Sequence, residues 1–125
     1  MSYKIPDKDL TVDPAGSVPT ITFNSNMSAT HYHVQVQTAT GWEMVVDDTG
    51  LGKAVPIKGA SIRSAADFAG KKFMWDVTLV APTATDTVEA VLQVKIDQDG
   101  RNLLTVNDDH NITDVEQYYE YLNAH

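Results

Sequence analysis

Two histidines at alternate positions, His31 and His33, are the residues of this chain best placed to do chemistry. On a β-strand, side chains at i and i+2 project from the same face, roughly 6.5–7 Å apart at the backbone. Two imidazoles at that spacing can bind one metal ion, with each nitrogen about 2.0–2.1 Å from the metal. One hypothesis is therefore a zinc site at His31 and His33, whose third ligand would come from His110, His125 or an aspartate.

The histidine pair belongs to the stretch 30–38, Thr-His-Tyr-His-Val-Gln-Val-Gln-Thr, in which polar and apolar residues alternate. This alternation is typical of a strand with one face on the core and the other in solvent. The apolar face carries Tyr32, Val34 and Val36. The polar face carries His31, His33, Gln35 and Gln37. Alternation alone accounts for the polar residues, so a plain solvent-exposed face is the simplest interpretation, and a ligand-binding face is a third hypothesis.

The ligand-binding hypothesis depends on Trp42, which follows a predicted hairpin loop at 38–41. An exposed tryptophan beside amides suits a sugar, because the ring stacks on C–H groups while the amides bind hydroxyls. Trp42 with His33, Gln35 and Gln37 would form such a platform. The opposing interpretation packs Trp42 against a facing sheet, where its large apolar surface would be buried.

An acidic stretch at 97–102, Asp-Gln-Asp-Gly-Arg-Asn, invites a calcium hypothesis with Asp97 and Asp99 as ligands. An EF-hand loop, however, places its glycine later and lies between two helices. Here the flanking segments alternate as strands do. Asp-Gly between alternating runs predicts a hairpin turn instead, because both residues tolerate positive φ.

The elements that must position these residues are predicted to be strands. Period-two alternation or apolar runs mark the segments 19–24, 29–38, 42–46, 73–81, 88–96 and 103–106. Strands do not alternate with helices, so we expect an all-β fold, an antiparallel β-sandwich of immunoglobulin-like or jelly-roll-like type. Residues 1–18 lack a sustained apolar period and are expected to form an N-terminal arm or an edge segment.

The last segment changes period. Thr113-Asp-Val-Glu116 matches a capping box, in which the threonine and the glutamate each accept from a backbone amide of the other. Residues at helical spacing follow, namely Val115, Tyr118, Tyr119 and Leu122. We therefore expect a short C-terminal α-helix over 113–124, with Tyr118 and Tyr119 docked on the sandwich and Tyr121 off the apolar stripe.

Composition limits the classes of partner. The chain has 125 residues, which is the length of a single domain, 1–125. It has no cysteine, which excludes disulfides and thiolate chemistry and suits a reducing compartment. Its net charge of −8 does not suit nucleic acid or an anionic membrane surface, since both need a basic face. The first residues show no apolar run of a signal peptide, so we expect a cytoplasmic location.

Sequence patterns of the common enzymes are absent, including G-x-S-x-G and H-E-x-x-H. We therefore expect a non-catalytic, lectin-like binding module that takes a carbohydrate through its polar strand face and end loops, without a cofactor. A protein is the alternative partner. Two other classes stay open: a metal-dependent enzyme that uses the His31-x-His33 pair with zinc or calcium, and a structural or self-assembly subunit that forms a homo-oligomer.

Overall fold

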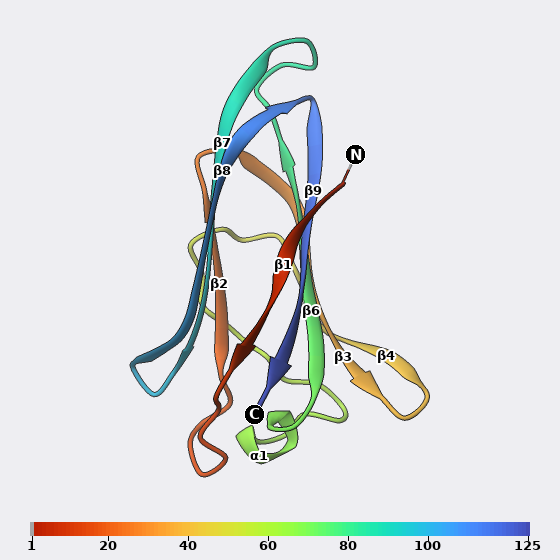
Figure 1. Ribbon diagram of the computed structural model, residues 1–125, viewed down its shortest axis with the longest axis vertical. Coiled ribbons are helices and arrows are strands. Elements are labelled where there is room, and N and C mark those ends of the chain that lie inside the picture. The colour runs from red at the N-terminus through yellow and green to blue at the C-terminus, as the bar shows by residue number, and fades with distance from the viewer. Residues whose placement is uncertain (1) are drawn as a thin grey trace.

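A computed structural model of the chain describes residues 2–125, and within them nine strands form two sheets. The five-stranded sheet has the order β1-β9-β6-β3-β4. It consists of β1 (Ser2–Leu10), β9 (Val115–Ala124), β6 (Lys72–Val80), β3 (Ser28–Thr38) and β4 (Gly41–Asp48). The four-stranded sheet has the order β5-β2-β7-β8. It consists of β5 (Val55–Pro56), β2 (Thr20–Ser25), β7 (Thr87–Gln98) and β8 (Arg101–Thr113). Figure 1 shows the two sheets facing each other, and the prediction of an all-β fold is confirmed.

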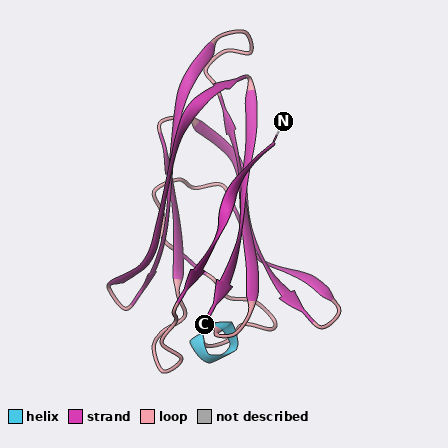
Figure 2. Cartoon of the chain, in the orientation of Figure 1, coloured by secondary structure: helices cyan, strands magenta, loops and turns pink. Residues whose placement is uncertain are grey.

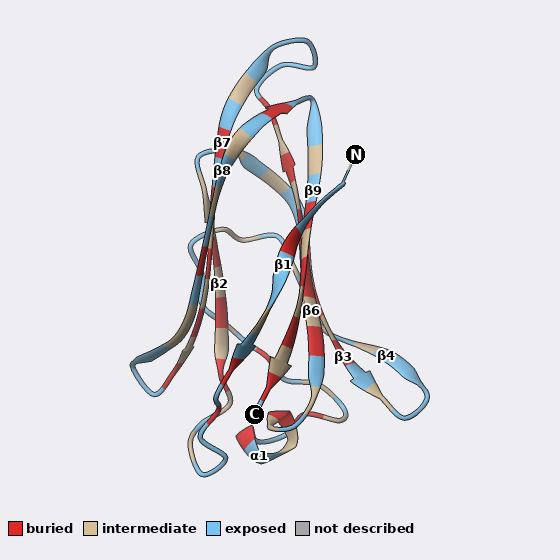
Figure 3. Ribbon diagram, in the orientation of Figure 1, coloured by how far each residue is buried: buried red, intermediate tan, exposed pale blue. Residues whose placement is uncertain are grey.

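The core lies between the two sheets, as the alternation predicts. The inward residues of the central strands are buried: Tyr32, Val34, Val36, Phe73, Trp75, Val77, Leu79, Ala90, Leu92, Val94 and Ile96. In Figure 3 buried segments alternate with exposed and intermediate ones along the strands of both sheets. Because successive strand residues point to opposite sides, this burial sends their neighbours to the outer faces.

Two tight hairpins follow the turn chemistry of the sequence. Asp99 and Gly100 connect β7 to β8 with φ of 51° and 75°, the pair of positive values that a type I′ turn requires. The connection from β3 to β4 is also two residues long and consists of Ala39 and Thr40. The hairpin predicted at 97–100 and the loop predicted at 38–41 are both confirmed.

The C-terminal helix predicted over 113–124 is wrong, because residues 115–124 form the strand β9. β9 lies between β6, with which it pairs from Asn123 to Val115, and β1. Those two neighbours satisfy its backbone groups on both sides, and this outweighs a helix preference that is worth only tenths of a kcal/mol per residue. Figure 2 shows strand, not helix, at the C-terminus, and the only helix among the described residues is α1 (Ala65–Phe68).

Of the two forms predicted for the N-terminal segment, an arm or an edge segment, the structure shows the edge segment. β1 pairs in parallel with β9 at the edge of the five-stranded sheet, and its register shifts between Ile5 and Lys8. The chain that follows β1 is tied to the other sheet by Gln98, whose buried amide exchanges hydrogen bonds with the backbone of Asp13 and donates to the carbonyl of Ser17. A buried amide satisfied in this way holds an irregular segment in one conformation.

The crossing between β4 and β6 closes one end of the core. Pro56 lies in the two-residue strand β5, at a sheet edge where a proline costs no ladder hydrogen bond. Ile57, Ile62 and Phe68 of this crossing are fully buried.

None of the described residues lies in a helix that is long and apolar enough to cross a membrane.

Candidate ligand-binding face

The outer face of the five-stranded sheet brings together side chains from four strands. Residues opposite each other in a sheet project to the same side. The register pairs Gln35 with Met44 on one side and with Met74 on the other, and Met74 pairs in turn with Tyr121. In the next row Gln37 pairs with Trp42. These residues therefore form one continuous surface.

Three aromatic side chains on this surface, Trp42, Tyr119 and Tyr121, form what we call the aromatic platform. The ring centroids of Trp42 and Tyr121 are 6.0 Å apart, and those of Tyr119 and Tyr121 are also 6.0 Å apart. Two strands, β3 and β6, lie between β4 and β9, so Trp42 and Tyr121 meet over the side chains of those strands. Trp42 is 40% exposed, and the alternative in which it packs against the facing sheet is therefore wrong.

Sequence reasoning missed Tyr119 and Tyr121 as members of one face, because it placed both on a helix. A strand places Tyr119 and Tyr121 together on the outer side and Tyr118 in the core, where it is fully buried. The signal was present in the alternation Tyr118, Glu120, Leu122, Ala124, since three of these four are apolar or aromatic. Glu120 interrupts the pattern, and the helical spacing of the tyrosines competes with it.

Two lysines flank the platform. The Nζ atom of Lys72 lies 5.2 Å from the centroid of the Tyr121 ring, and that of Lys4 lies 5.9 Å from it. Both distances are within the range of a cation–π contact. Lys4 is also paired with Asp7 at 2.6 Å, and the hydrogen bond from Lys4 lowers the pKa of the Asp7 carboxyl.

His31 and His33 lie on the same outer face but form a separate group with two aspartates. Their rings are parallel, with centroids 5.8 Å apart. His33 Nδ1 is 2.8 Å from Asp76 Oδ1, and its Nε2 is 3.5 Å from Asp47 Oδ1. His31 Nε2 is 4.0 Å from the same Asp47 oxygen. The predicted polar strip is therefore divided: Gln35 and Gln37 lie beside the aromatic platform, whereas His31 and His33 lie beside Asp47 and Asp76.

The two histidines considered as third metal ligands lie elsewhere, whereas Asp47 and Asp76 lie beside His31 and His33. His110 is on β8 of the other sheet, 2.5 Å from Asp108, and His125 is 3.6 Å from Asp9. No group of three or more His, Asp or Glu side chains in the described part of the chain has the geometry to hold a metal ion. What the arrangement around His33 provides is a hydrogen-bonded imidazole whose orientation is fixed by Asp76.

The aspartates of the calcium hypothesis are engaged in hydrogen bonds, Asp97 within its hairpin and Asp99 with the segment that follows β1. Asp97 Oδ1 accepts a hydrogen bond from Asn102 Nδ2 at 2.9 Å. Asp99 Oδ2 accepts one from the backbone amide of Ser17 at 3.1 Å, and the hydrogen bonds from Ser17 lower the pKa of Asp99. Both carboxylates therefore have a structural role in the turn.

A second polar cluster lies at the edge between the sheets. The ring of Tyr3 lies tilted against that of His110, with centroids 4.3 Å apart, and the ring of Tyr118 lies 5.2 Å from the same imidazole. Tyr118 Oη and His110 Nε2 are buried and have no hydrogen-bond partner among residues 2–125. Burial, followed by the charges of Asp108 and Glu116, raises the pKa of Tyr118, so its hydroxyl stays protonated.

The chain matches no protein-family model, and no curated protein or solved structure matches it. The function of the aromatic platform must therefore be argued from its own geometry.

Proposed function

We propose that this protein is a non-catalytic binding module that takes a carbohydrate on the aromatic platform. In this proposal the two sheets form a β-sandwich of the immunoglobulin-like or jelly-roll-like type, and the five-stranded sheet supplies the binding face. Absence of cysteine suits a cytoplasmic location, which we include in the proposal.

The observation that carries the proposal is the exposure of Trp42 within 6.0 Å of Tyr121. A large aromatic side chain normally buries its surface, and one held in solvent beside a second ring offers an area for a flat apolar partner. The C–H face of a pyranose ring is such a partner. Strand pairing fixes the backbone that carries the two rings, so a ligand would meet a surface whose scaffold is already ordered, which lowers the entropic cost of binding.

Amide groups beside the rings suit the hydroxyls of a sugar. Gln37 pairs with Trp42, and Gln35 lies in the row that ends at Tyr121. A side-chain amide both donates and accepts hydrogen bonds, so it can bind a hydroxyl in either role. Stacking surfaces with a small number of polar groups that fix orientation are the usual composition of a small-molecule site.

The test is a binding screen by isothermal titration calorimetry against soluble oligosaccharides, both neutral and acidic. We expect the Trp42→Ala variant to weaken binding at least tenfold, since aromatic anchors dominate interfaces of this kind. Val91→Ala is the matched control, because Val91 is also 40% exposed but lies on the other sheet. Unchanged affinity in Trp42→Ala, or an equal loss in Val91→Ala, would refute the platform as the site.

A protein partner, including a second copy of the chain, is the second candidate. Met44 is 48% exposed next to the platform, and Met, Tyr and Trp are enriched at protein interfaces. Sedimentation equilibrium distinguishes the two. A dimer that Met44→Ser and Trp42→Ala dissociate would favour self-assembly, whereas a monomer at high concentration would count against it.

A further inference from the structure

We propose that the aromatic platform selects sugars that carry a carboxylate, and that Lys72 is the residue that recognises it. This inference rests on the proposed carbohydrate-binding function and specifies the class of ligand. The ring of a uronic acid would stack on Tyr121 and Trp42 while its carboxylate pairs with the Lys72 ammonium.

The first argument is position. Lys72 begins β6, where it pairs with Asn123 on the outer face, and its Nζ atom lies 5.2 Å from the centroid of the Tyr121 ring. On the neighbouring strand β3, Gln37 follows Val36, the partner of Phe73, and Gln37 itself pairs with Trp42. Lys72 therefore lies in the same row as the tryptophan and beside the tyrosine. A ligand stacked on both rings would lie within reach of its ammonium group.

The second argument is charge. Lys4 is the other cation near Tyr121, but its ammonium is already paired with Asp7 at 2.6 Å. Within residues 2–125, no carboxylate lies within ion-pair distance of Lys72, although its charge, after the hydrogen bond from Lys4, also lowers the pKa of the Asp7 carboxyl. Lys4 and Lys72 share this end of the outer face with the carboxylates of Asp7 and Asp9, and Lys72 is the lysine there that no carboxylate of the described residues engages directly. The far end of the outer face carries the carboxylates of Asp47 and Asp76, so an anionic group is better placed beside Lys72 than at that end.

The third argument concerns size. The whole chain has a net charge of −8, which repels a long polyanion. A single carboxylate beside Lys72 escapes most of that repulsion, because charges farther than about 8 Å are largely screened at physiological ionic strength. Short uronate oligomers are therefore the form of ligand that this face suits best.

The experiment compares oligosaccharides that differ only in charge. Dimers of galacturonic acid, glucuronic acid and mannuronic acid are titrated beside their methyl esters, which keep the ring and remove the charge. We expect at least one acid to bind about tenfold more tightly than its ester at low salt, as one charge-assisted hydrogen bond allows. The preference should decrease as sodium chloride is added.

Variants assign the preference to Lys72. Lys72→Met should bind acid and ester equally, and Lys72→Arg should retain the preference because it keeps the charge. Lys95→Met is the matched control, since Lys95 lies on β7 of the other sheet. Both positions, Lys72 and Lys95, are outside the core, and circular dichroism would verify folding of each of the three variants.

The outcomes separate the two proposals. Equal binding of acid and ester, with both lost in Trp42→Ala, would overturn the role of Lys72 and leave the carbohydrate platform standing. A preference for the acid that survives in Lys72→Met would also overturn it. Absence of binding to every acid and every ester would overturn the uronate proposal, whereas the carbohydrate platform is overturned only if the full screen of neutral and acidic oligosaccharides also gives no binding.

Discussion

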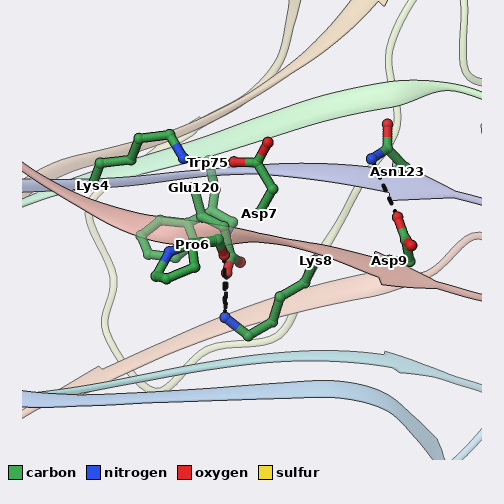
Figure 4. A network of polar contacts seen from close by, with 8 residues as sticks. All are labelled: Lys4, Pro6, Asp7, Lys8, Asp9, Trp75, Glu120 and Asn123. Carbon is green, nitrogen blue, oxygen red and sulfur yellow. Dashed lines mark hydrogen bonds and ion pairs between the residues drawn. The ribbon is translucent and has the colours of Figure 1, made fainter.

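The indole N–H of Trp75 donates a hydrogen bond of 2.9 Å to the carboxylate of Glu120, and both side chains are fully buried between the sheets. Glu120 also accepts from Lys8 at 3.0 Å, as Figure 4 shows. The register shift of β1 between Ile5 and Lys8 brings the lysine to this carboxylate. Without these two donors, a buried carboxylate would be very costly.

Replacement of Glu120 by glutamine should change how stability depends on pH. Burial raises the pKa of Glu120 above its ordinary 4.5, although the hydrogen bonds from Lys8 and Trp75 oppose the shift. The folded protein then holds this proton more tightly than the unfolded chain. Stability contributed by the protonated form is complete below pH 4.5 and is lost as the pH rises through the folded pKa. Urea unfolding should be measured at a series of pH values from below 4.5 to neutral. As the pH rises, the free energy of unfolding of Glu120→Gln should increase relative to that of the wild type. A pH-independent difference would show that Glu120 titrates normally.

The ion pair of Lys8 should matter more than that of Lys4. Lys8 is 35% exposed and its partner is buried, so Lys8→Met leaves a buried carboxylate without its cation. We expect Lys8→Met to lower the free energy of unfolding by about 1–3 kcal/mol at neutral pH, and by less in acid, where Glu120 takes up a proton. Lys4→Met, whose pair with Asp7 is exposed, should cost at most about 1 kcal/mol. Equal losses in urea titrations would contradict the assignment.

Two buried tyrosines should respond oppositely to loss of their hydroxyls. Tyr118 Oη has no hydrogen-bond partner among the described residues, whereas Tyr32 Oη donates to the carbonyl of Gly50 at 2.7 Å. Tyr118→Phe should therefore raise the free energy of unfolding by about 1 kcal/mol, because it removes an unsatisfied buried polar group. Tyr32→Phe should lower it by a similar amount, about 1 kcal/mol. Thermal unfolding of both variants tests this, and destabilisation by Tyr118→Phe would point to a buried water on its hydroxyl.

Added zinc should leave the melting temperature unchanged. His33 Nδ1 is engaged by Asp76, and no third ligand completes a site with His31 within residues 2–125. A metal at a hundredfold over its Kd would stabilise the fold by about 2.7 kcal/mol, a rise of several degrees for a domain of this length. Scans with EDTA, zinc and calcium measure this. A rise with zinc that His33→Ala abolishes would restore the metal hypothesis.

The inner and outer faces of β3, β6 and β7 could be predicted from alternation, because each of these strands has one face on the core. The turn at Asp99-Gly100 was also predictable, since few residues other than Asp, Asn and Gly tolerate its φ values. Alternation also predicts that Gln35 and Gln37 point to the outer face, opposite to Val34 and Val36. Prediction failed at 113–124, where a helical spacing and a strand alternation coexist in the same residues.

By itself, the sequence determined which residues of each central strand face the core, because side-chain direction alternates along any strand whatever its neighbours are. It also determined the hairpin turns, because backbone φ is restricted residue by residue. Only the tertiary structure decided that residues 115–124 are a strand, because β1 and β6 supply hydrogen-bond partners that lie far away in the chain. That decision placed Tyr121 beside Trp42 and Lys72. The platform depends on strand order, which no local pattern encodes.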